Sequence, residues 1–447
     1  MLQKKDLMKF LIDHLLIGLK LTKIISMKYT TILLVFFIFM ASCHKDDDTN
    51  NQTDENGVIT SLSYQWKKSL HNGDTFNSNG RIKSPIYYNG NIAIPTTNGE
   101  NSRFLTMINP TNGETIWQWN DNYLPYSNQI SISYYYQYNN LLTYQTGTNS
   151  YCVNLDDGTT QWKFRRDSPF DVRLYPSYGG NFFNSSSFVN NEGYNEQIMT
   201  KVEINTGNLT TEVIRANYSG DYINSSNFIG GVTNVTKLAT NNNLYAVTYF
   251  EHSPTWVVNS YLGLYNYETD AWVYERKLMA PPTTNSSAYE PIIYNNKLYA
   301  WVGKNIVCHN LDTGEQIWRK SFPQDFLFSG FIIEDDKVIA NNEDTFTYCL
   351  NPENGNIIWK TESSGTSGRM SYLNGIVYFV GGSTGKLHAI DVSNGEHVWK
   401  INAGNLGESG SSSFKTNAVY VFEAENGNPA KIIALSHLNA YSFEAYQ

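Results

Sequence analysis

Residues 311–318 read Leu311-Asp312-Thr313-Gly314-Glu315-Gln316-Ile317-Trp318, and residues 390–399 repeat this phrase around Gly395 and Trp399. Each copy joins the end of a short apolar strand to a turn at glycine and then to a tryptophan. The phrase occurs seven times, with further clear copies at 109–117, 155–162 and 351–359 and degenerate ones at 205–207 and 267–272. A recurring phrase at intervals of mostly 40–49 residues is typical of a repeat architecture.

A second marker is a tight turn between two apolar strands, expected at eight places. Asn and Gly tolerate the positive φ that two-residue hairpins need. The eight turns are Asn89-Gly90, Asn139-Asn140, Gly179-Gly180, Asn242-Asn243, Asn295-Asn296, Asp335-Asp336, Asn374-Gly375 and Thr416-Asn417. Turn and phrase alternate along the chain, which predicts one four-stranded antiparallel blade per repeat.

The fold predicted from these marks is an all-β, eight-bladed β-propeller. Its last blade lacks a glycine phrase, and Lys431–Leu435 is assigned as the third strand of that blade. The segment that starts at Trp66 resembles the one at Trp318 but has no phrase before it. We therefore expect this N-terminal strand to complete the last blade and close the ring, which would leave no open sheet edge at the seam. The alternative is seven blades, with residues 436–447 as their own outer strand.

Composition agrees with many short strands and excludes one class of ligand. Aromatic residues make up 14% of the chain and charged residues only 16%, a balance that suits pleated sheets. The formal net charge of −9 argues against nucleic acid as a partner, because nucleic-acid binding needs a basic face.

The N-terminus is predicted to be a targeting segment. Lys28 precedes an apolar run over 32–40, followed by Ala41-Ser42-Cys43, which is the pattern of a signal peptide with small residues before a cysteine. This pattern resembles a bacterial lipobox and implies a lipid on Cys43, and so membrane attachment through that lipid. The division is then 1–42 signal peptide, with 1–26 an over-extended gene start, 43–57 an acidic flexible tether, and 58–447 the propeller.

At this point the chain resembles a known family. The phrase Asp-x-x-Thr-Gly-x-x-x-Trp is similar to the repeat of PQQ-like (quinoprotein-type) propellers, which include quinone-dependent dehydrogenases and BamB-type outer-membrane barrel-assembly lipoproteins. The resemblance covers residues 58–447. It implies that the tryptophans dock blade against blade, namely Trp66, Trp117, Trp162, Trp272, Trp318, Trp359 and Trp399.

The cysteines and histidines do not indicate a metal or redox site. Cys152, Cys308 and Cys349 each lie six residues before a repeat glycine, so they should occupy one buried position in three blades. A disulfide between Cys308 and Cys349 is the alternative, although equivalent positions in neighbouring blades should lie too far apart. The histidines show no zinc-like spacing.

No catalytic residue, cofactor or metal ligand is predicted. The quinone-dependent dehydrogenases of this fold have adjacent cysteines and a calcium-binding carboxylate constellation, and neither is found in this sequence. A PQQ-dependent dehydrogenase is therefore the third of three interpretations.

The candidate partner-binding residues lie where the repeat is least regular. Between Gly207 and Asp270 the marks are 63 residues apart, and long loops on a rigid scaffold are frequent recognition sites. Aromatic side chains in this stretch suit protein contacts or sugar stacking, and the candidates are Tyr218, Tyr222, Phe228 and Trp256.

The sequence thus predicts a non-catalytic scaffold lipoprotein of the outer membrane, on its periplasmic face or at the cell surface, that binds a protein. A role in outer-membrane protein assembly follows from the resemblance alone. A surface carbohydrate-binding protein is the second interpretation.

Overall fold

A computed structural model of the protein describes most of the chain after Asn51. The described residues are 52–71, 81–82, 86–97, 103–123, 131–132, 135–146, 149–165, 174–176, 181–189, 195–215, 230–241, 243–252, 257–282, 289–326, 329–408, 412–425 and 427–446. They belong to one compact unit that begins at Gln52.

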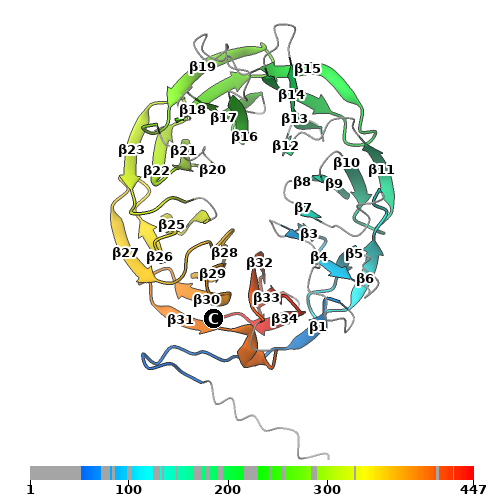
Figure 1. Ribbon diagram of the computed structural model, residues 1–447, viewed down its shortest axis with the longest axis vertical. Helices are drawn as coiled ribbons and strands as arrows, with labels where there is room; N and C mark the ends of the chain where they lie inside the picture. Colours follow the sequence, from blue (N-terminus) through cyan, green and yellow to red (C-terminus); the bar gives the residue numbers. More distant parts are fainter. Residues whose placement is uncertain are drawn as a thin grey trace, which may run out of the picture. The chain divides into compact units, whose positions relative to one another are not determined.

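Eight four-stranded antiparallel sheets stand as blades around a ring (Figure 1). In seven of them the chain runs from the innermost strand to the outermost in sequence order. From inner to outer these seven blades are β3 Ile86–Tyr88, β4 Asn91–Thr97, β5 Arg103–Ile108 and β6 Thr115–Trp119; β8 Tyr135–Tyr138, β9 Leu141–Thr146, β10 Asn149–Asn154 and β11 Thr160–Arg165; β12 Leu174–Pro176, β13 Phe182–Val189, β14 Asn195–Val202 and β15 Leu209–Arg215; β16 Gly230–Lys237, β17 Leu244–His252, β18 Val258–Asn266 and β19 Ala271–Leu278; β20 Tyr289–Tyr294, β21 Lys297–Val302, β22 Asn305–Asn310 and β23 Gln316–Ser321; β24 Phe331–Glu334, β25 Lys337–Asn341, β26 Phe346–Leu350 and β27 Ile357–Glu362; and β28 Ser371–Leu373, β29 Ile376–Gly381, β30 Lys386–Asp391 and β31 His397–Ile401.

The eighth sheet contains both ends of the propeller. Its order is β32 (Phe414–Phe422), β33 (Lys431–Ser436), β34 (Asn439–Glu444) and β1 (Trp66–Ser69). β1 pairs antiparallel with β34, with Trp66 opposite Ser442 and Ser69 opposite Asn439. The N-terminal strand is therefore the outermost strand of the last blade. A short parallel pair, β2 (Arg81–Ile82) with β7 (Ser131–Ile132), lies outside the blades.

The strand assignment inside this closing blade was wrong when made from sequence. Lys431–Leu435 falls in the second strand, not the third, and β34 is the third strand rather than an outer one. Thr416-Asn417 is not a hairpin turn, because β32 runs through both residues and its pairing with β33 shifts register between Phe414 and Val419. Asn417 has a φ of 61°, so a residue that tolerates positive φ produces an irregularity within a strand here and not a chain reversal.

The other predicted turns behave as hairpins where they are described. Asn89, Asn139, Asn295, Asp335 and Asn374 all have φ between 46° and 52°, the left-handed conformation that such turns require. Gly179-Gly180 and Asn242 lie outside the described residues.

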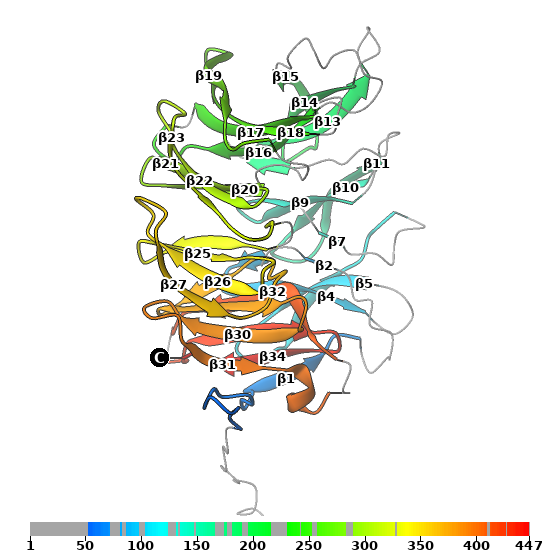
Figure 2. The same ribbon diagram turned by 60° about the vertical axis from the view of Figure 1, so that its left-hand side comes forward.

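The chain before β1 forms a strap on the neighbouring blade. In this N-terminal strap (residues 52–62), Ile59 forms a parallel bridge with Trp399 and its carbonyl accepts from the Lys400 N–H at 2.9 Å. Asp54 forms an ion pair with Lys400 at 2.6 Å. The strap, drawn in blue, lies beside β31 in both ribbon views (Figure 2). Residues 43–51 of the expected tether lie outside the described residues, whereas 52–57 contact the propeller.

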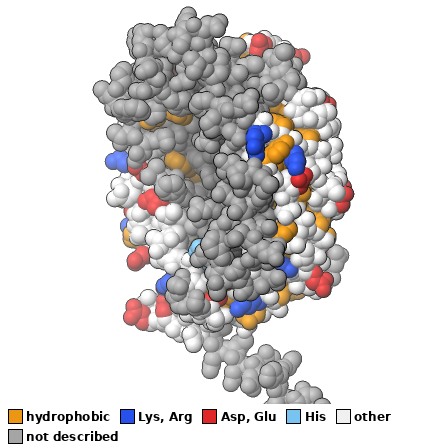
Figure 3. Space-filling view, turned by 45° about the vertical axis from the view of Figure 1, so that its right-hand side comes forward, with side chains coloured by type: hydrophobic (Ala, Val, Ile, Leu, Met, Phe, Trp, Pro, Cys, Tyr) orange, Lys and Arg blue, Asp and Glu red, His pale blue; other side chains and the backbone are white. Residues whose placement is uncertain are grey.

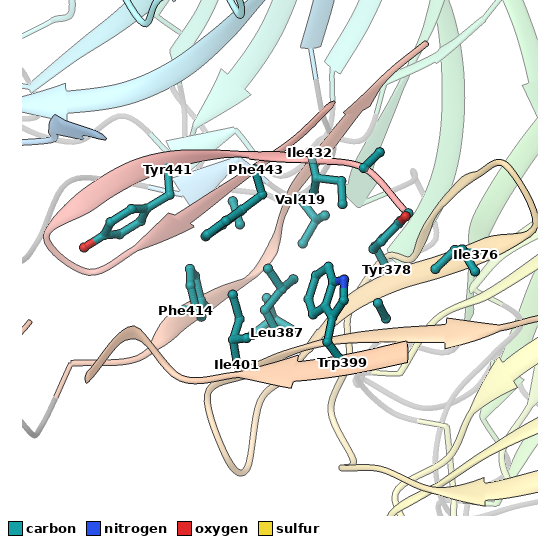
Figure 4. Close-up of a cluster of buried hydrophobic side chains, with 14 of the residues drawn as sticks. Ile376, Tyr378, Leu387, Trp399, Ile401, Phe414, Val419, Ile432, Tyr441 and Phe443 are labelled. Carbon is teal, nitrogen blue, oxygen red and sulfur yellow. The ribbon is translucent and has the colours of Figure 1, made fainter. Parts of the chain in front are cut away.

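The core lies between the faces of adjacent blades. In the largest cluster, Leu387, Trp399 and Ile401 of one blade face Phe414 and Tyr441 of the closing blade, all at most 3% exposed (Figure 4). Ile59 and Leu62 of the strap pack against this cluster. Within the described part of the chain, no helix has the length and apolar character needed to cross a membrane.

Candidate functional surfaces

The tryptophans of the repeat form the joints between blades. In each joint the indole N–H donates to a carbonyl in the next blade, at 2.6–3.0 Å. The pairs are Trp66 with Pro110, Trp117 with Leu155, Trp162 with Ile204, Trp318 with Pro352 and Trp359 with Val392. Trp66 belongs to the closing blade, so its joint with Pro110 completes the ring.

The repeat glycine is required because the indole lies directly on it. Gly355 has a φ of +69°, and a Cβ added there would lie 2.6 Å from Cε3 of Trp318. Gly113 stands in the same relation to Trp66, with 2.7 Å between the added Cβ and Cε3. Positive φ and missing space both exclude a side chain at this position. The phrase that identifies the repeat is thus a packing joint.

Trp272 does not form such a joint, contrary to the sequence prediction. It packs within its own blade, where a Cβ on Gly263 would lie 2.6 Å from its ring. Tyr274, two residues later, takes the docking position: its hydroxyl donates to the Leu311 carbonyl at 2.8 Å, and its ring covers Gly314. Register shifts in the pairing of β18 with β19 accompany this exchange.

Trp399 has a different surrounding again. The closing blade has no glycine phrase, and Trp399 is 3% exposed between that blade, Tyr378 and the strap. It remains a structural residue, as the sequence predicted.

The blade β16–β19 is longer than its neighbours and supports the region in which partner binding was predicted. Its strands have 8 or 9 residues, whereas those of β24–β27 have 4 to 6. The four candidates Tyr218, Tyr222, Phe228 and Trp256 lie outside the described residues, in the segments before β16 and between β17 and β18.

A buried ion pair underlies the end of this long blade. The Glu251 side chain is fully buried and receives both terminal nitrogens of Arg276, one of them at 2.9 Å. The guanidinium stacks 4.6 Å from the Tyr261 ring centroid, and the carboxylate raises the pKa of Arg276. Arg276 has a φ of 60°, and its N–H donates to the Tyr249 hydroxyl at 2.9 Å. Sequence analysis missed this pair because its members are 25 residues apart on β17 and β19 with no motif around them.

The three described cysteines are free thiols in equivalent buried places. Cys152, Cys308 and Cys349 lie opposite Trp162, Trp318 and Trp359 on the neighbouring strand. Burial raises the pKa of Cys152 to about 12 and that of the other two to about 11. Such thiols are unreactive core groups at neutral pH.

Two histidines meet beneath the strap. His388 Nδ1 and His397 Nε2 are 3.1 Å apart, and His388 stacks on Phe379 at 5.1 Å. Burial lowers the pKa of His388 to about 3 and that of His397 to about 4. Within the part of the chain that the structure covers, no group of three or more His, Cys, Asp or Glu side chains could hold a metal.

Hydrophobic side chains reach the rim of the propeller between charged ones, as Figure 3 shows for one side of the molecule. Ile116, Ile317 and Ile358, each just before a docking tryptophan, are 44–50% exposed. They are distributed one per blade and do not form a continuous patch.

The two kinds of turn lie together on one face, which we call the turn face. It consists of the hairpin turns between the first and second strands and the glycine turns between the third and fourth. Backbone hydrogen bonds join the two kinds within a blade, from Leu155 to Asn140 at 2.7 Å, from Leu311 to Asn296 at 3.1 Å and from Val392 to Gly375 at 2.9 Å. The link 423–430 of the closing blade belongs to the same face, because Lys431 beside it donates to Thr111 in a glycine turn.

These observations define the class of protein: a β-propeller whose blades are joined by tryptophan on glycine. The chain belongs to the family described as outer membrane protein assembly factor BamB, whose model matches residues 101–401 and 302–439. No curated protein matches the chain.

Solved structures agree with the fold. A computationally designed protein, Ika8, has a TM-score of 0.54 at 10% identity, covering 87% of this chain and 99% of its own. Sqt1 from Saccharomyces cerevisiae has a TM-score of 0.55 at 9% identity, covering 85% and 99%. BamB from Moraxella catarrhalis has a TM-score of 0.48 at 12% identity, covering 86% and 100%. At these identities the likeness concerns the fold alone.

Proposed function

We propose that this protein is a non-catalytic scaffold that binds another protein of the bacterial cell envelope and acts in outer-membrane protein assembly. The observation that carries the proposal is family membership over most of the propeller. The repeat residues support it: five indoles and Tyr274 are engaged in joints between blades. The joints build a rigid platform on which turns and loops can differ without loss of the fold.

The proposed location is the outer membrane, with the chain anchored by a lipid on Cys43. The sequence pattern at 28–43 supports this anchor, as does the family's description. Under this proposal residues 1–42 are removed and 58–447 form the working domain. Metabolic labelling with a radioactive fatty acid tests the anchor, and Cys43→Ser should abolish incorporation without changing the fold of the propeller.

Affinity purification after crosslinking in native membranes tests the assembly role. We expect wild-type protein to recover components of the outer-membrane assembly machinery, identified by mass spectrometry. A variant with Gly355→Ala, which disturbs a joint, serves as a folding-defective control. Recovery of the same proteins by this variant and by wild type, or of no assembly component by either, would contradict the proposal.

A further inference from the structure

The turn face has an unusual balance of charge. Asp and Glu occur at sixteen described positions in its turns and adjoining strand ends, and Lys or Arg at none. The segments counted are 89–90, 109–114, 139–140, 154–159, 203–208, 243, 266–270, 295–296, 310–315, 334–336, 351–356, 374–375, 391–396, 423–425 and 427–430. The acidic residues are Glu114, Asp156, Asp157, Glu203, Glu268, Asp270, Asp312, Glu315, Glu334, Asp335, Asp336, Glu353, Asp391, Glu396, Glu423 and Glu425.

The fold explains only part of this charge. The Asn296 amide donates to Asp312 at 2.7 Å and the Asn243 amide to Glu268 at 2.7 Å, which joins hairpin turn to glycine turn. The first residue of the glycine turn needs a side-chain acceptor for the N–H two residues on, and Asn310 supplies it at 2.9 Å. These contacts need an acceptor but not a negative charge, since asparagine or serine oxygens accept equally well.

The negative charges are exposed and weakly compensated. All sixteen except Asp391 are exposed. Lys297 and Lys337 directly follow hairpin turns, and Lys297 is paired with Glu353. Burial and the neighbouring Asp335 raise the pKa of Glu334. Crowded like charges disfavour the compact state, so folding does not account for their concentration on one face.

Large aromatic side chains lie on innermost strands near the same turns. Tyr87 on β3 and Tyr138 on β8 are 38% and 40% exposed. The Tyr87 ring contacts Phe422 of β32, with centroids 5.5 Å apart. The backbone of Tyr87 accepts from the Gln137 amide at 2.8 Å, which ties β3 to β8. Exposed tyrosines beside carboxylates can bind lysine and arginine through both ring face and charge.

From this complementarity we infer that the turn face is the docking surface for a basic, Lys- and Arg-rich segment of the partner protein. The inference rests on the proposed scaffold function and names the face and the chemistry of its partner. It differs from the sequence prediction, which placed binding in the irregular stretch between Gly207 and Asp270. Most of the turn-face carboxylates belong to the regular repeats.

The test uses a fluorescent decalysine peptide as the probe and the whole protein as the target. A turn-face variant combines Glu114→Gln, Glu315→Gln and Glu396→Gln, three exposed positions in different blades. A matched control combines Glu55→Gln, Asp325→Asn and Glu362→Gln, which removes the same net charge away from the turns. Fluorescence anisotropy at low and at physiological salt gives the Kd of each.

We expect the wild-type Kd to rise steeply with salt. The turn-face variant should bind about tenfold more weakly and the control should change less than about twofold. Equal weakening by the two variants would show that only net charge matters and would overturn the inference, as would absence of binding at low salt.

The crosslinking experiment separates this inference from the proposed function. If the turn-face variant recovers the same assembly components as wild type, the scaffold function stands and the turn face is not the docking surface. If decalysine binds as expected but no assembly component is recovered, the acidic surface stands and the assembly role falls.

Discussion

The joint at Trp318 and the joint at Tyr274 connect consecutive pairs of blades, yet only the first follows the repeat. Trp318 covers Gly355 and donates to Pro352 at 2.7 Å. Tyr274 covers Gly314 and donates to Leu311 at 2.8 Å, from a position two residues after the repeat tryptophan. The geometry of the joint is thus kept while its residue changes. The blade that makes this change also has longer strands and a buried Glu251–Arg276 pair.

The largest expected effect is in the irregular blade. Arg276→Met should lower the free energy of unfolding by about 3–5 kcal/mol, because it leaves the fully buried Glu251 without its cation. Urea unfolding followed by circular dichroism measures the loss. The double variant Arg276→Met with Glu251→Gln should regain most of it, since no charge is then buried. A loss below about 1 kcal/mol in the single variant would show that Glu251 is not held by this pair.

The next effect is in the regular joint. Gly355→Ala should cost about 3 kcal/mol, because the new Cβ is strained at positive φ and would meet the Trp318 ring at 2.6 Å. Gly375→Ala is the matched control, with a φ of +80° but no atom within 4 Å of the added Cβ, and should cost only about 1–2 kcal/mol of strain. Equal losses in urea unfolding would mean that the indole does not pack on the glycine.

Acidification should weaken the regular part of the ring through its histidines. The folded pKa values of about 3 for His388 and about 4 for His397 lie below their ordinary value of 6.5. The unfolded chain therefore binds more protons between pH 4 and 6.5, so this stability is present above pH 6.5 and lost as the pH falls. From pH 7 to pH 5 we expect a loss of about 2 kcal/mol. Thermal unfolding of the double variant His388→Leu with His397→Gln should show a flatter pH profile. An unchanged profile would exclude the pair as the cause.

The smallest effect refines the comparison of the two joints. Tyr274→Phe keeps the ring over Gly314 but removes the hydrogen bond to Leu311, and should cost about 1 kcal/mol. Tyr274→Ala removes the ring as well and should cost about 3–5 kcal/mol, as other large aromatic truncations do. If the two variants lose equal stability by urea unfolding, the ring contributes nothing to the joint.

Repeated, local features were predictable from sequence, and unrepeated ones were not. The glycine turns, the hairpins at Asn89, Asn295 and Asn374 and the docking of Trp318 all follow from short phrases, because each turn depends on residues adjacent in the chain. The closing blade was misassigned because Thr416-Asn417 resembles a turn, whereas β32 continues through it. Local sequence does not distinguish a turn from a bulge when both accept positive φ at asparagine.

The candidate surfaces divide in the same way. The acidic residues of the turn face were visible in the sequence, but only the structure collects turns from all around the ring on one face. Glu251 and Arg276 had no sequence signal, because their pairing depends on the register of β17, β18 and β19.

The sequence by itself determined the repeat, the family and the chemistry of each joint, since a glycine with no room for a side chain and a tryptophan above it are both encoded within one short phrase. The tertiary structure decided which residue docks when the phrase decays, how the N-terminal strand and strap close the ring, and which charges share a face. These features depend on contacts between residues tens to hundreds of positions apart, such as Trp66 with Ser442, and no local pattern of side chains specifies such a contact.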